Sequence, residues 1–117
     1  FPIVPLWIDG RPAEAHSTRL GAVMNPSTGT QIRAVPLADA TDVDAAVASA
    51  RRALPAWRAT TPLRRARILT RFRELLEANQ KAIATLISEE HGKVFLDAMG
   101  SVQRGIEVVE FATGAPH

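Results

Sequence analysis

The sequence predicts a small antiparallel β unit across residues 1–37, followed by about four α-helices across residues 41–113. Two observations support this fold class. Short apolar runs separated by turn-forming residues fill the first part, whereas apolar residues recur every three or four positions through the second. Because the chain contains no strand–helix–strand crossover of its own, the residues alone predict an α+β arrangement.

A β-hairpin is predicted at residues 5–15. Asp9-Gly10 separates two short strand-like runs, residues 6–8 and 11–15. Asp-Gly is favoured in two-residue hairpin turns because both turn positions require a positive φ. We therefore expect two short antiparallel strands that are joined at Asp9-Gly10.

A second strand pair or extended segment is predicted across residues 22–37. Asn25-Pro26-Ser27-Thr28-Gly29 has the composition of a turn, in which Gly29 can adopt a positive φ. Residues 31–37 after this turn alternate in polarity as a strand does, and Pro36 is expected at the edge or end of that strand.

Four helices are predicted near residues 42–57, 62–78, 80–91 and 94–113. Thr41 and Asp44 form a capping-box-like start for the first helix, which is expected to end near Pro55. Thr61-Pro62 starts the second helix with proline at the first helical position, and Gly92 is suited to follow the third. On the second and third helices, the apolar side chains expected to be buried are Leu63, Ala66, Leu69, Phe72, Leu75, Leu76, Ile83, Leu86 and Ile87.

The composition is that of an ordinary globular protein, with 46% hydrophobic and 22% charged residues among 117. A formal net charge of +2 is too small to indicate nucleic acid or an anionic membrane as a partner. The chain has no cysteine, which excludes a disulfide framework and a cysteine nucleophile within these residues. No apolar run approaches the ~20 residues that cross a bilayer, and no signal-peptide pattern is present. We expect a cytoplasmic, bacterial protein, and both ends of the sequence read as cut.

Arg104 is the residue most informative about chemistry, because it interrupts the apolar pattern of the last helix. The apolar flank expected beside it comprises Val102, Ile106, Val109 and Phe111. A guanidinium beside apolar side chains costs free energy unless a carboxylate or phosphate meets its donors. The spacing leaves two interpretations open. In one, Arg104 forms an ion pair within its helix with Glu107 or Asp97; in the other, it faces a pocket and binds an anion.

The other polar clusters favour structural roles. The arginine cluster at residues 64–73 lacks interleaved aromatic residues, so we expect a solvated face or an inter-subunit salt-bridge surface. In His91-Gly92-Lys93, a histidine at a helix C-terminus is more typical of a cap that suits the helix dipole than of a catalytic group. Glu89-Glu90 point to different faces of a helix and make no acid–base pair. The three histidines lack the spacing of metal ligands, and no phosphate-binding or nucleophile motif is present.

Several segments, taken in order, resemble the N-terminal quarter of an aldehyde dehydrogenase. They are Asn25-Pro26-Ser27-Thr28-Gly29 followed by Val35, then Ala53-Leu54-Pro55-Ala56-Trp57, then Pro62-Leu63-Arg64-Arg65-Ala66-Arg67-Ile68-Leu69. Within that superfamily, Glu90-His91-Gly92-Lys93 and residues 103–111 (QRGIEVVEF) resemble the CoA-acylating methylmalonate-semialdehyde dehydrogenase branch. The resemblance covers the whole chain without an obvious insertion.

The resemblance implies an α/β fold in which residues 1–117 form the leading part of a Rossmann-like NAD-binding domain. Catalytic and oligomerisation domains, the catalytic cysteine and the phosphate-cradling turn would come later, so no catalytic and no cofactor-binding residue is expected in this chain. The implied parent enzyme uses NAD and coenzyme A to convert methylmalonate or malonate semialdehyde to propionyl-CoA or acetyl-CoA. The resemblance also implies that Arg104 lines the substrate tunnel and binds the substrate carboxylate.

Further expectations follow from the same resemblance. The full-length protein is expected to be a homo-oligomer, tetramer or dimer, that acts on a small molecule without nucleic acid or membrane partners, and the 117-residue chain alone is expected to be inactive. Two alternatives stay open: another aldehyde dehydrogenase for an anionic substrate such as succinate semialdehyde, and a stand-alone helical interaction module that descends from this fold.

Overall fold

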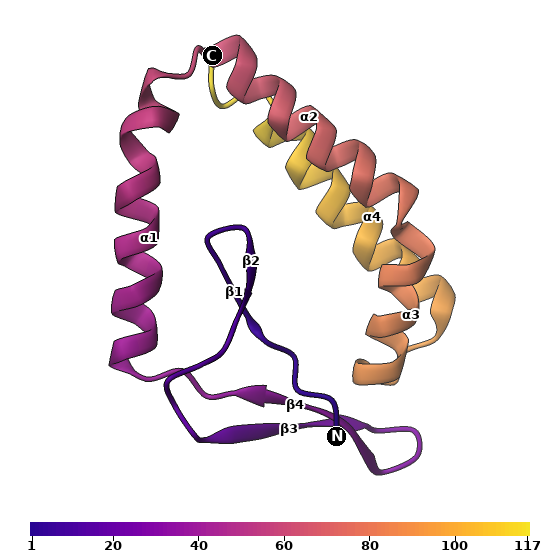
Figure 1. Ribbon diagram of the computed structural model, residues 1–117. Coiled ribbons are helices and arrows are strands. Elements are labelled where there is room, and N and C mark those ends of the chain that lie inside the picture. Colours follow the sequence, from indigo (N-terminus) through magenta and orange to yellow (C-terminus); the bar gives the residue numbers. More distant parts are fainter. The chain divides into compact units, whose positions relative to one another are not determined.

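The computed structural model describes all residues, 1–117, and the chain divides into two compact units, Phe1–Trp57 and Arg58–His117 (Figure 1). The first unit contains two separate two-stranded sheets and most of the first helix, and the second contains three further helices. The predicted order, strands first and helices afterwards, is confirmed.

Strands β1 (Leu6–Ile8) and β2 (Arg11–Ala13) form the predicted antiparallel hairpin. The turn between them places Asp9 at φ 59° and Gly10 at φ 71°. Two positive φ angles in succession define the tight hairpin turn that Asp-Gly favours. The turn sequence thus fixes where the two strands reverse.

Strands β3 (Leu20–Asn25) and β4 (Thr30–Pro36) form the second antiparallel pair, with an irregularity between Val23 and Met24. In the connecting turn the Asn25 carbonyl accepts a hydrogen bond from the Gly29 N–H at 2.8 Å, and Gly29 has φ 69°. Pro36 is the last residue of β4, as predicted, and one more backbone hydrogen bond follows it, from the Leu37 N–H to the Arg19 carbonyl at 2.9 Å.

The N-terminal segment adds a short parallel contact to the second sheet. The Val4 N–H donates to the Ala34 carbonyl at 2.9 Å, and the Ala34 N–H donates to the Pro2 carbonyl at 3.0 Å. Ala34 is buried at the centre of this arrangement. Both edges of β4 are therefore paired at this point, which spares buried backbone groups from losing their hydrogen bonds.

Helix α1 (Ala40–Ala59) begins earlier and ends later than the sequence predicts. Its reciprocal cap is formed by Asp39 and Asp42 rather than by Thr41 and Asp44: the Asp42 N–H donates to Asp39 Oδ1 at 3.1 Å, and the Asp39 N–H donates to Asp42 Oδ2 at 3.0 Å. The expected end near Pro55 is also wrong, since Pro55 lies inside the helix. Four more residues continue the helix past Pro55, although a proline within a helix removes one N–H donor and its ring crowds the carbonyl four residues earlier.

Helices α2 (Pro62–Ala78), α3 (Gln80–His91) and α4 (Phe95–Ala112) make up the second unit. Thr61 caps α2 through a 3.4 Å hydrogen bond from the Arg64 N–H, with Pro62 at the first helical position as predicted. Gly92 ends α3 with φ 85°, the left-handed conformation expected of a residue after a helix. None of the helices is both long and apolar enough to span a membrane.

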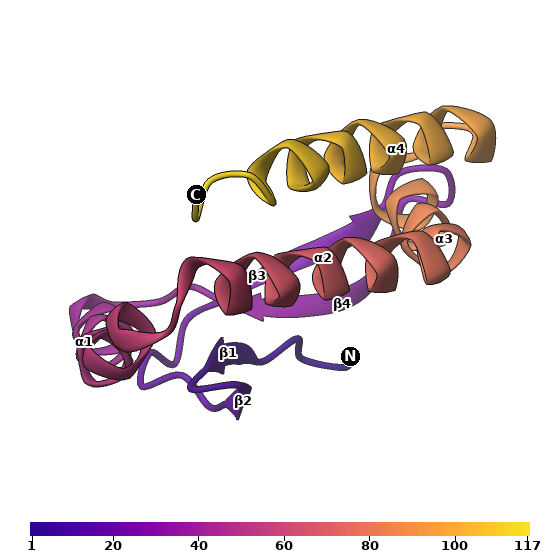
Figure 2. The ribbon, with the colours of Figure 1, turned by 90° about the horizontal axis from the view of Figure 1, so that it is seen from above.

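Helices α2 and α3 pack against α4, as both ribbon views show (Figures 1 and 2). The core between them contains small and branched side chains, which allow the helix backbones to approach closely. Its buried members are Ala84, Ala98, Val102 and Ile106, with Leu76, Ile83, Ile87 and Met99 packed around them.

The predicted buried stripes are only partly right. Ala66 is buried, and Leu69, Leu76, Ile83 and Ile87 are half-buried. The other large members, Leu63, Phe72, Leu75 and Leu86, are 44–52% exposed. These stripes are wider than one neighbouring helix can cover, so apolar surface is left over on both helices.

Candidate functional site

Helix α4 presents Arg104 on the side away from its core. Val102 and Ile106, two residues before and after Arg104, are buried, and Ile106 is only 2% exposed. A step of two residues leads to the far side of an α-helix, and Arg104 is accordingly exposed. The expected apolar flank is therefore wrong in one member, because Phe111 is 89% exposed and shares the side of Arg104.

The side of α4 that carries Arg104 holds several apolar or small residues, and it also holds Asp97 seven positions before Arg104 and Glu107 three positions after it. Leu96, Gly100, Val108 and Phe111 lie on it at helical spacing, and we call these four residues and Arg104 the Arg104 face. Its three large apolar side chains are exposed, Leu96 by 82%. Large apolar side chains that are exposed on one side of a helix indicate a surface that another part of a protein covers. The Arg104 guanidinium therefore lies on a helix side that carries exposed apolar side chains together with two carboxylates.

The Arg104 guanidinium lies back along α4 toward the start of the helix. Its Nη2 donates to Ser101 Oγ at 3.2 Å, and its Nη1 lies 3.6 Å from the position that a Cβ on Gly100 would occupy. Long side chains on helices point in this direction by preference. A small residue at position 100 leaves room beside the guanidinium.

Neither of the carboxylates considered from the spacing pairs with Arg104. Glu107 instead accepts a hydrogen bond from Gln103 Nε2 at 3.4 Å, and Asp97 pairs with Lys93 Nζ at 3.1 Å. A guanidinium has five N–H donors, of which Ser101 engages one. Arg104 thus retains free donors in the forked arrangement that matches a carboxylate.

Lys93 and Ser101 join Arg104 in one hydrogen-bonded group. Lys93 Nζ donates to Ser101 Oγ at 2.9 Å, while Asp97 lies on the other side of the ammonium. The Lys93 side chain is 19% exposed, so its methylenes lie along the helix surface. The sequence reading missed this group: the Lys93–Asp97 spacing signals an i,i+4 pair, but no pattern identifies Ser101 as the acceptor that links two cations.

The arginine cluster on α2 forms ion pairs with glutamates. Arg71 pairs with Glu74 at 3.2 Å and Arg73 with Glu77 at 2.8 Å, and Arg73 also lies 3.9 Å from Glu110 of α4. The hydrogen bond with Glu77 raises the pKa of Arg73 above its ordinary range. Two members of the cluster thus form ion pairs within the chain, and the expected solvated face or inter-subunit salt-bridge surface stays a prediction.

The histidine of the His91-Gly92-Lys93 segment is the last residue of α3. The Gly92 N–H donates to the Ser88 carbonyl at 2.9 Å and closes the last turn of that helix. This position is the one predicted for a helix cap. No three His, Asp or Glu side chains in the structure are grouped as metal ligands would be.

A second polar cluster lies in the first unit and links residues 23 and 26 positions apart. His16 Nδ1 and Asp39 Oδ2 share a 2.8 Å hydrogen bond, and the His16 N–H donates to Asp42 Oδ1 at 2.6 Å. The bond to Asp39 raises the pKa of His16 and lowers the pKa of Asp39. The pKa of Asp42 is lowered by the N–H groups of Asp39 and His16. The sequence predicts an isolated His16, because local sequence patterns do not reveal contacts between residues more than 20 positions apart.

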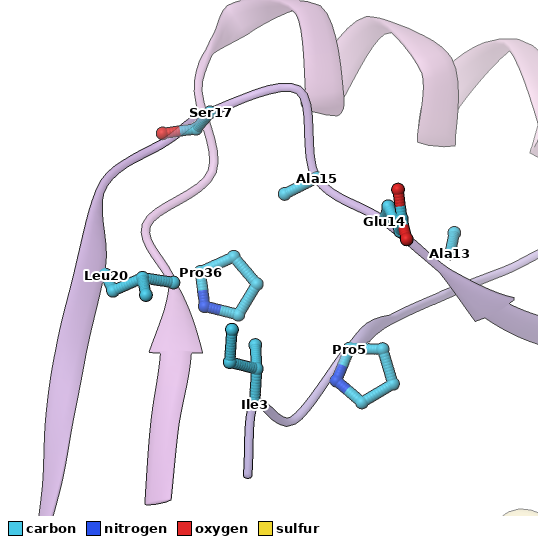
Figure 3. A pocket seen from close by; sticks show the side chains of 8 residues that line it. All are labelled: Ile3, Pro5, Ala13, Glu14, Ala15, Ser17, Leu20 and Pro36. Atoms are coloured by element: carbon cyan, nitrogen blue, oxygen red, sulfur yellow. The ribbon is translucent and has the colours of Figure 1, made fainter. Parts of the chain in front are cut away.

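A hollow of about 390 Å³ lies between the strands of the first unit (Figure 3). Figure 3 shows the Ile3 side chain next to the Pro36 ring, with Glu14 farther along the wall. The residues that line it are Ile3, Pro5, Ala13, Glu14, Ala15, Ser17, Leu20 and Pro36. They supply one carboxylate and one hydroxyl but no paired base and nucleophile, so the hollow does not have the composition of a catalytic site.

Comparison with known proteins gives a consistent result. Residues 13–117 match the sequence profile of the aldehyde dehydrogenase family. The malonate-semialdehyde dehydrogenase of Pseudomonas aeruginosa is 53% identical over 102 residues, which is 87% of this chain and 20% of that protein.

Solved structures agree with the sequence match. The methylmalonate-semialdehyde dehydrogenase of Oceanimonas doudoroffii superposes with a TM-score of 0.92 at 46% identity, over 99% of this chain and 24% of that one. A protein of Sinorhizobium meliloti 1021, provisionally named methylmalonate-semialdehyde dehydrogenase and complexed with NAD, superposes with a TM-score of 0.93 at 43% identity, over 98% of this chain and 23% of that one. The chain thus spans about a fifth to a quarter of the length of the proteins it matches.

Proposed function

Because the chain belongs to the aldehyde dehydrogenase family, we propose that it forms the N-terminal part of an NAD-dependent, CoA-acylating dehydrogenase for malonate or methylmalonate semialdehyde. The named relatives support this substrate class, since they carry the names malonate- or methylmalonate-semialdehyde dehydrogenase and are 43–53% identical. The observation that carries the proposal is the Arg104 face: a guanidinium with free donors beside exposed apolar side chains, paired with neither nearby carboxylate, suits an aldehyde that bears a carboxylate.

The proposed reaction needs groups beyond these residues. The chain has no cysteine, so the nucleophile that attacks the aldehyde carbon lies outside residues 1–117. After oxidation the thioester loses CO2 and passes to coenzyme A, which gives acetyl-CoA or propionyl-CoA. NAD, when bound, accepts the hydride from the substrate carbon. The 117 residues contain no glycine-rich turn of the kind that holds a dinucleotide phosphate, so we assign none of them to NAD.

The contribution of this chain is recognition of the substrate carboxylate. A carboxylate has two oxygens that can each accept one N–H from the Arg104 fork, and such a pair fixes orientation as well as position. Leu96, Val108 and Phe111 around it exclude water when the face is covered, which strengthens the charge-assisted hydrogen bonds. A substrate held by its carboxylate presents its aldehyde carbon in a defined direction, and defined orientation lowers the barrier to attack.

The placement of this chain in the leading part of the NAD-binding domain, the cytoplasmic location and the homo-oligomeric state are parts of the same proposal. The domain placement and the homo-oligomeric state rest on the family resemblance. The identity of the acyl acceptor, coenzyme A, is the most specific part of the proposal and is tested separately from the oxidation step.

The test is the steady-state activity of the protein expressed from its complete coding sequence. We expect NADH to form with malonate and methylmalonate semialdehyde, and we expect acetyl-CoA or propionyl-CoA to be detected by mass spectrometry when coenzyme A is present. Succinate semialdehyde, whose carboxylate lies one carbon farther from the aldehyde, should be a poorer substrate. A preference for succinate semialdehyde, or hydrolysis to a free acid whether or not coenzyme A is added, would contradict the proposal.

A further inference from the structure

Ser101 Oγ accepts hydrogen bonds from two cations at once. Lys93 Nζ lies 2.9 Å from it and Arg104 Nη2 lies 3.2 Å from it. A serine hydroxyl has two acceptor lone pairs and one donor hydrogen. Both lone pairs are used here, so the hydroxyl hydrogen points to neither cation and has no acceptor within the chain.

Lys93 is itself fixed in place. Its ammonium lies between Ser101 Oγ and Asp97 Oδ2, at 2.9 and 3.1 Å, and the side chain is mostly covered. Asp97 neutralises one of the two cations that meet at Ser101. Lys93, Asp97 and Arg104 together carry one net positive charge, and Glu107 on the next turn of α4 accepts a hydrogen bond from Gln103 rather than from Arg104.

Ser101 also determines which part of the guanidinium is free. Its hydroxyl accepts a hydrogen bond from Arg104 Nη2 on the side toward the start of α4. Gly100 has no side chain that could push the guanidinium away from this position. An arginine without such a contact samples many rotamers, and binding must then immobilise it. A guanidinium that is already held loses less freedom when it meets its ligand.

We propose that Lys93 and Ser101 are positioning residues that hold the Arg104 guanidinium for the substrate carboxylate, and that the Ser101 hydroxyl donates a further hydrogen bond to that carboxylate. The inference rests on the proposed function, because it assigns the specificity of the same site. It assigns carboxylate recognition to Arg104 and Ser101 together, with Lys93 acting through its hydrogen bond to Ser101.

Replacement of Ser101 tests the proposal in the complete enzyme. Ser101→Ala removes the acceptor and the free donor, and we expect KM for malonate semialdehyde to rise about two- to tenfold, the cost of immobilising one flexible side chain. The kcat value should change little, because the reacting atoms are not touched. Ser101→Thr keeps the hydroxyl and should restore KM. With propionaldehyde, which has no carboxylate, neither substitution should change KM.

Lys93→Met is the second variant that tests the positioning role. It removes the donor that fixes Ser101 and leaves Asp97 free to attract Arg104, so KM for malonate semialdehyde should rise in the same way. Gln103→Ala is the matched control: Gln103 adjoins Arg104 in sequence, but it contacts Gln80 and Glu107. It should leave KM unchanged for both aldehydes.

A binding measurement separates this inference from the proposed function. The dissociation constant of malonate, measured by calorimetry on the complete protein, should rise about two- to tenfold in Ser101→Ala. That rise in a protein inactive with malonate semialdehyde would overturn the proposed substrate and support the positioning role. Unchanged KM and unchanged malonate affinity in an active enzyme would overturn the positioning role alone. A protein that neither binds malonate nor oxidises the semialdehyde would overturn both.

Discussion

Arg104→Leu in the complete enzyme should separate substrates that carry a carboxylate from those that lack one. In this chain Arg104 makes one hydrogen bond, to a neutral hydroxyl, and no ion pair, so its removal breaks little that holds α4 in place. Leucine at this position joins an apolar face formed by Leu96, Val108 and Phe111. The fold should therefore tolerate the change, and the main loss should be the contact with the substrate.

The size of that loss follows from the type of contact. Hydrogen bonds to charged groups are worth about 1.5–3 kcal/mol, so kcat/KM for malonate or methylmalonate semialdehyde should fall about tenfold to hundredfold. The kcat/KM for propionaldehyde should be unchanged or higher, because an apolar side chain replaces a cation next to an apolar substrate. Arg104→Lys should recover only part of the loss, since an ammonium lacks the planar fork.

The assay is NADH formation measured with both aldehydes over a range of concentrations. Arg67→Leu provides the control, because it removes an equal charge from the exposed surface of α2. It should affect neither substrate. Equal losses with the two aldehydes in Arg104→Leu would show that Arg104 supports the structure rather than the substrate, and would refute the reasoning.

Three further predictions concern stability and assembly. Ile106→Ala should lower the free energy of unfolding by about 2–5 kcal/mol, because it empties a buried position, whereas Lys81→Ala on the exposed side of α3 should change it by less than about 0.5 kcal/mol; thermal unfolding of the complete protein compares the two, and equal changes would contradict the packing. The raised pKa of His16 means that its bond to Asp39 contributes stability that is fully present below the ordinary value of 6.5 and is lost as the pH rises through the raised value. In His16→Asn, the protection of β3 and β4 amides against hydrogen exchange should no longer show this loss of stability at higher pH. An unaltered pH profile would contradict the assignment. The 117-residue polypeptide alone should self-associate and show no micromolar NAD binding, because many large apolar side chains are exposed and no dinucleotide turn is present; a monomer by light scattering, or heat of NAD binding in calorimetry, would contradict this.

Local signals predicted the elements of the fold well. Asp9-Gly10 located the hairpin, and Thr61-Pro62 and Gly92 located a helix start and a helix end, because each of these residues imposes a backbone conformation within one turn. The cap of α1 was misplaced because Thr41 and Asp39 both precede acidic residues at the right spacing. Only the positions of the Asp39 and Asp42 carboxylates in three dimensions show which pair forms.

The candidate site was harder to predict, since it depends on which face of α4 is covered. The sequence identified Arg104, but apolar periodicity placed Phe111 with the buried residues although it lies on the Arg104 face. The role of Ser101 could not be predicted, because the hydrogen bonds of a serine within a helix depend on which side chains lie near it in three dimensions. Lys93 reaches Ser101 from eight residues earlier, a separation beyond the i,i+4 pairs that sequence spacing reveals.

The measurement that tests the central claim most directly is a crystal structure of the complete protein with NAD and malonate, a stable dicarboxylate related to the proposed substrate. We expect both oxygens of one malonate carboxylate to lie about 2.7–2.9 Å from two nitrogens of the Arg104 guanidinium. We also expect the Ser101 hydroxyl to stay in contact with Arg104. Malonate bound elsewhere, or an Arg104 guanidinium turned away to a protein carboxylate in the presence of malonate, would contradict the claim that this chain recognises the substrate.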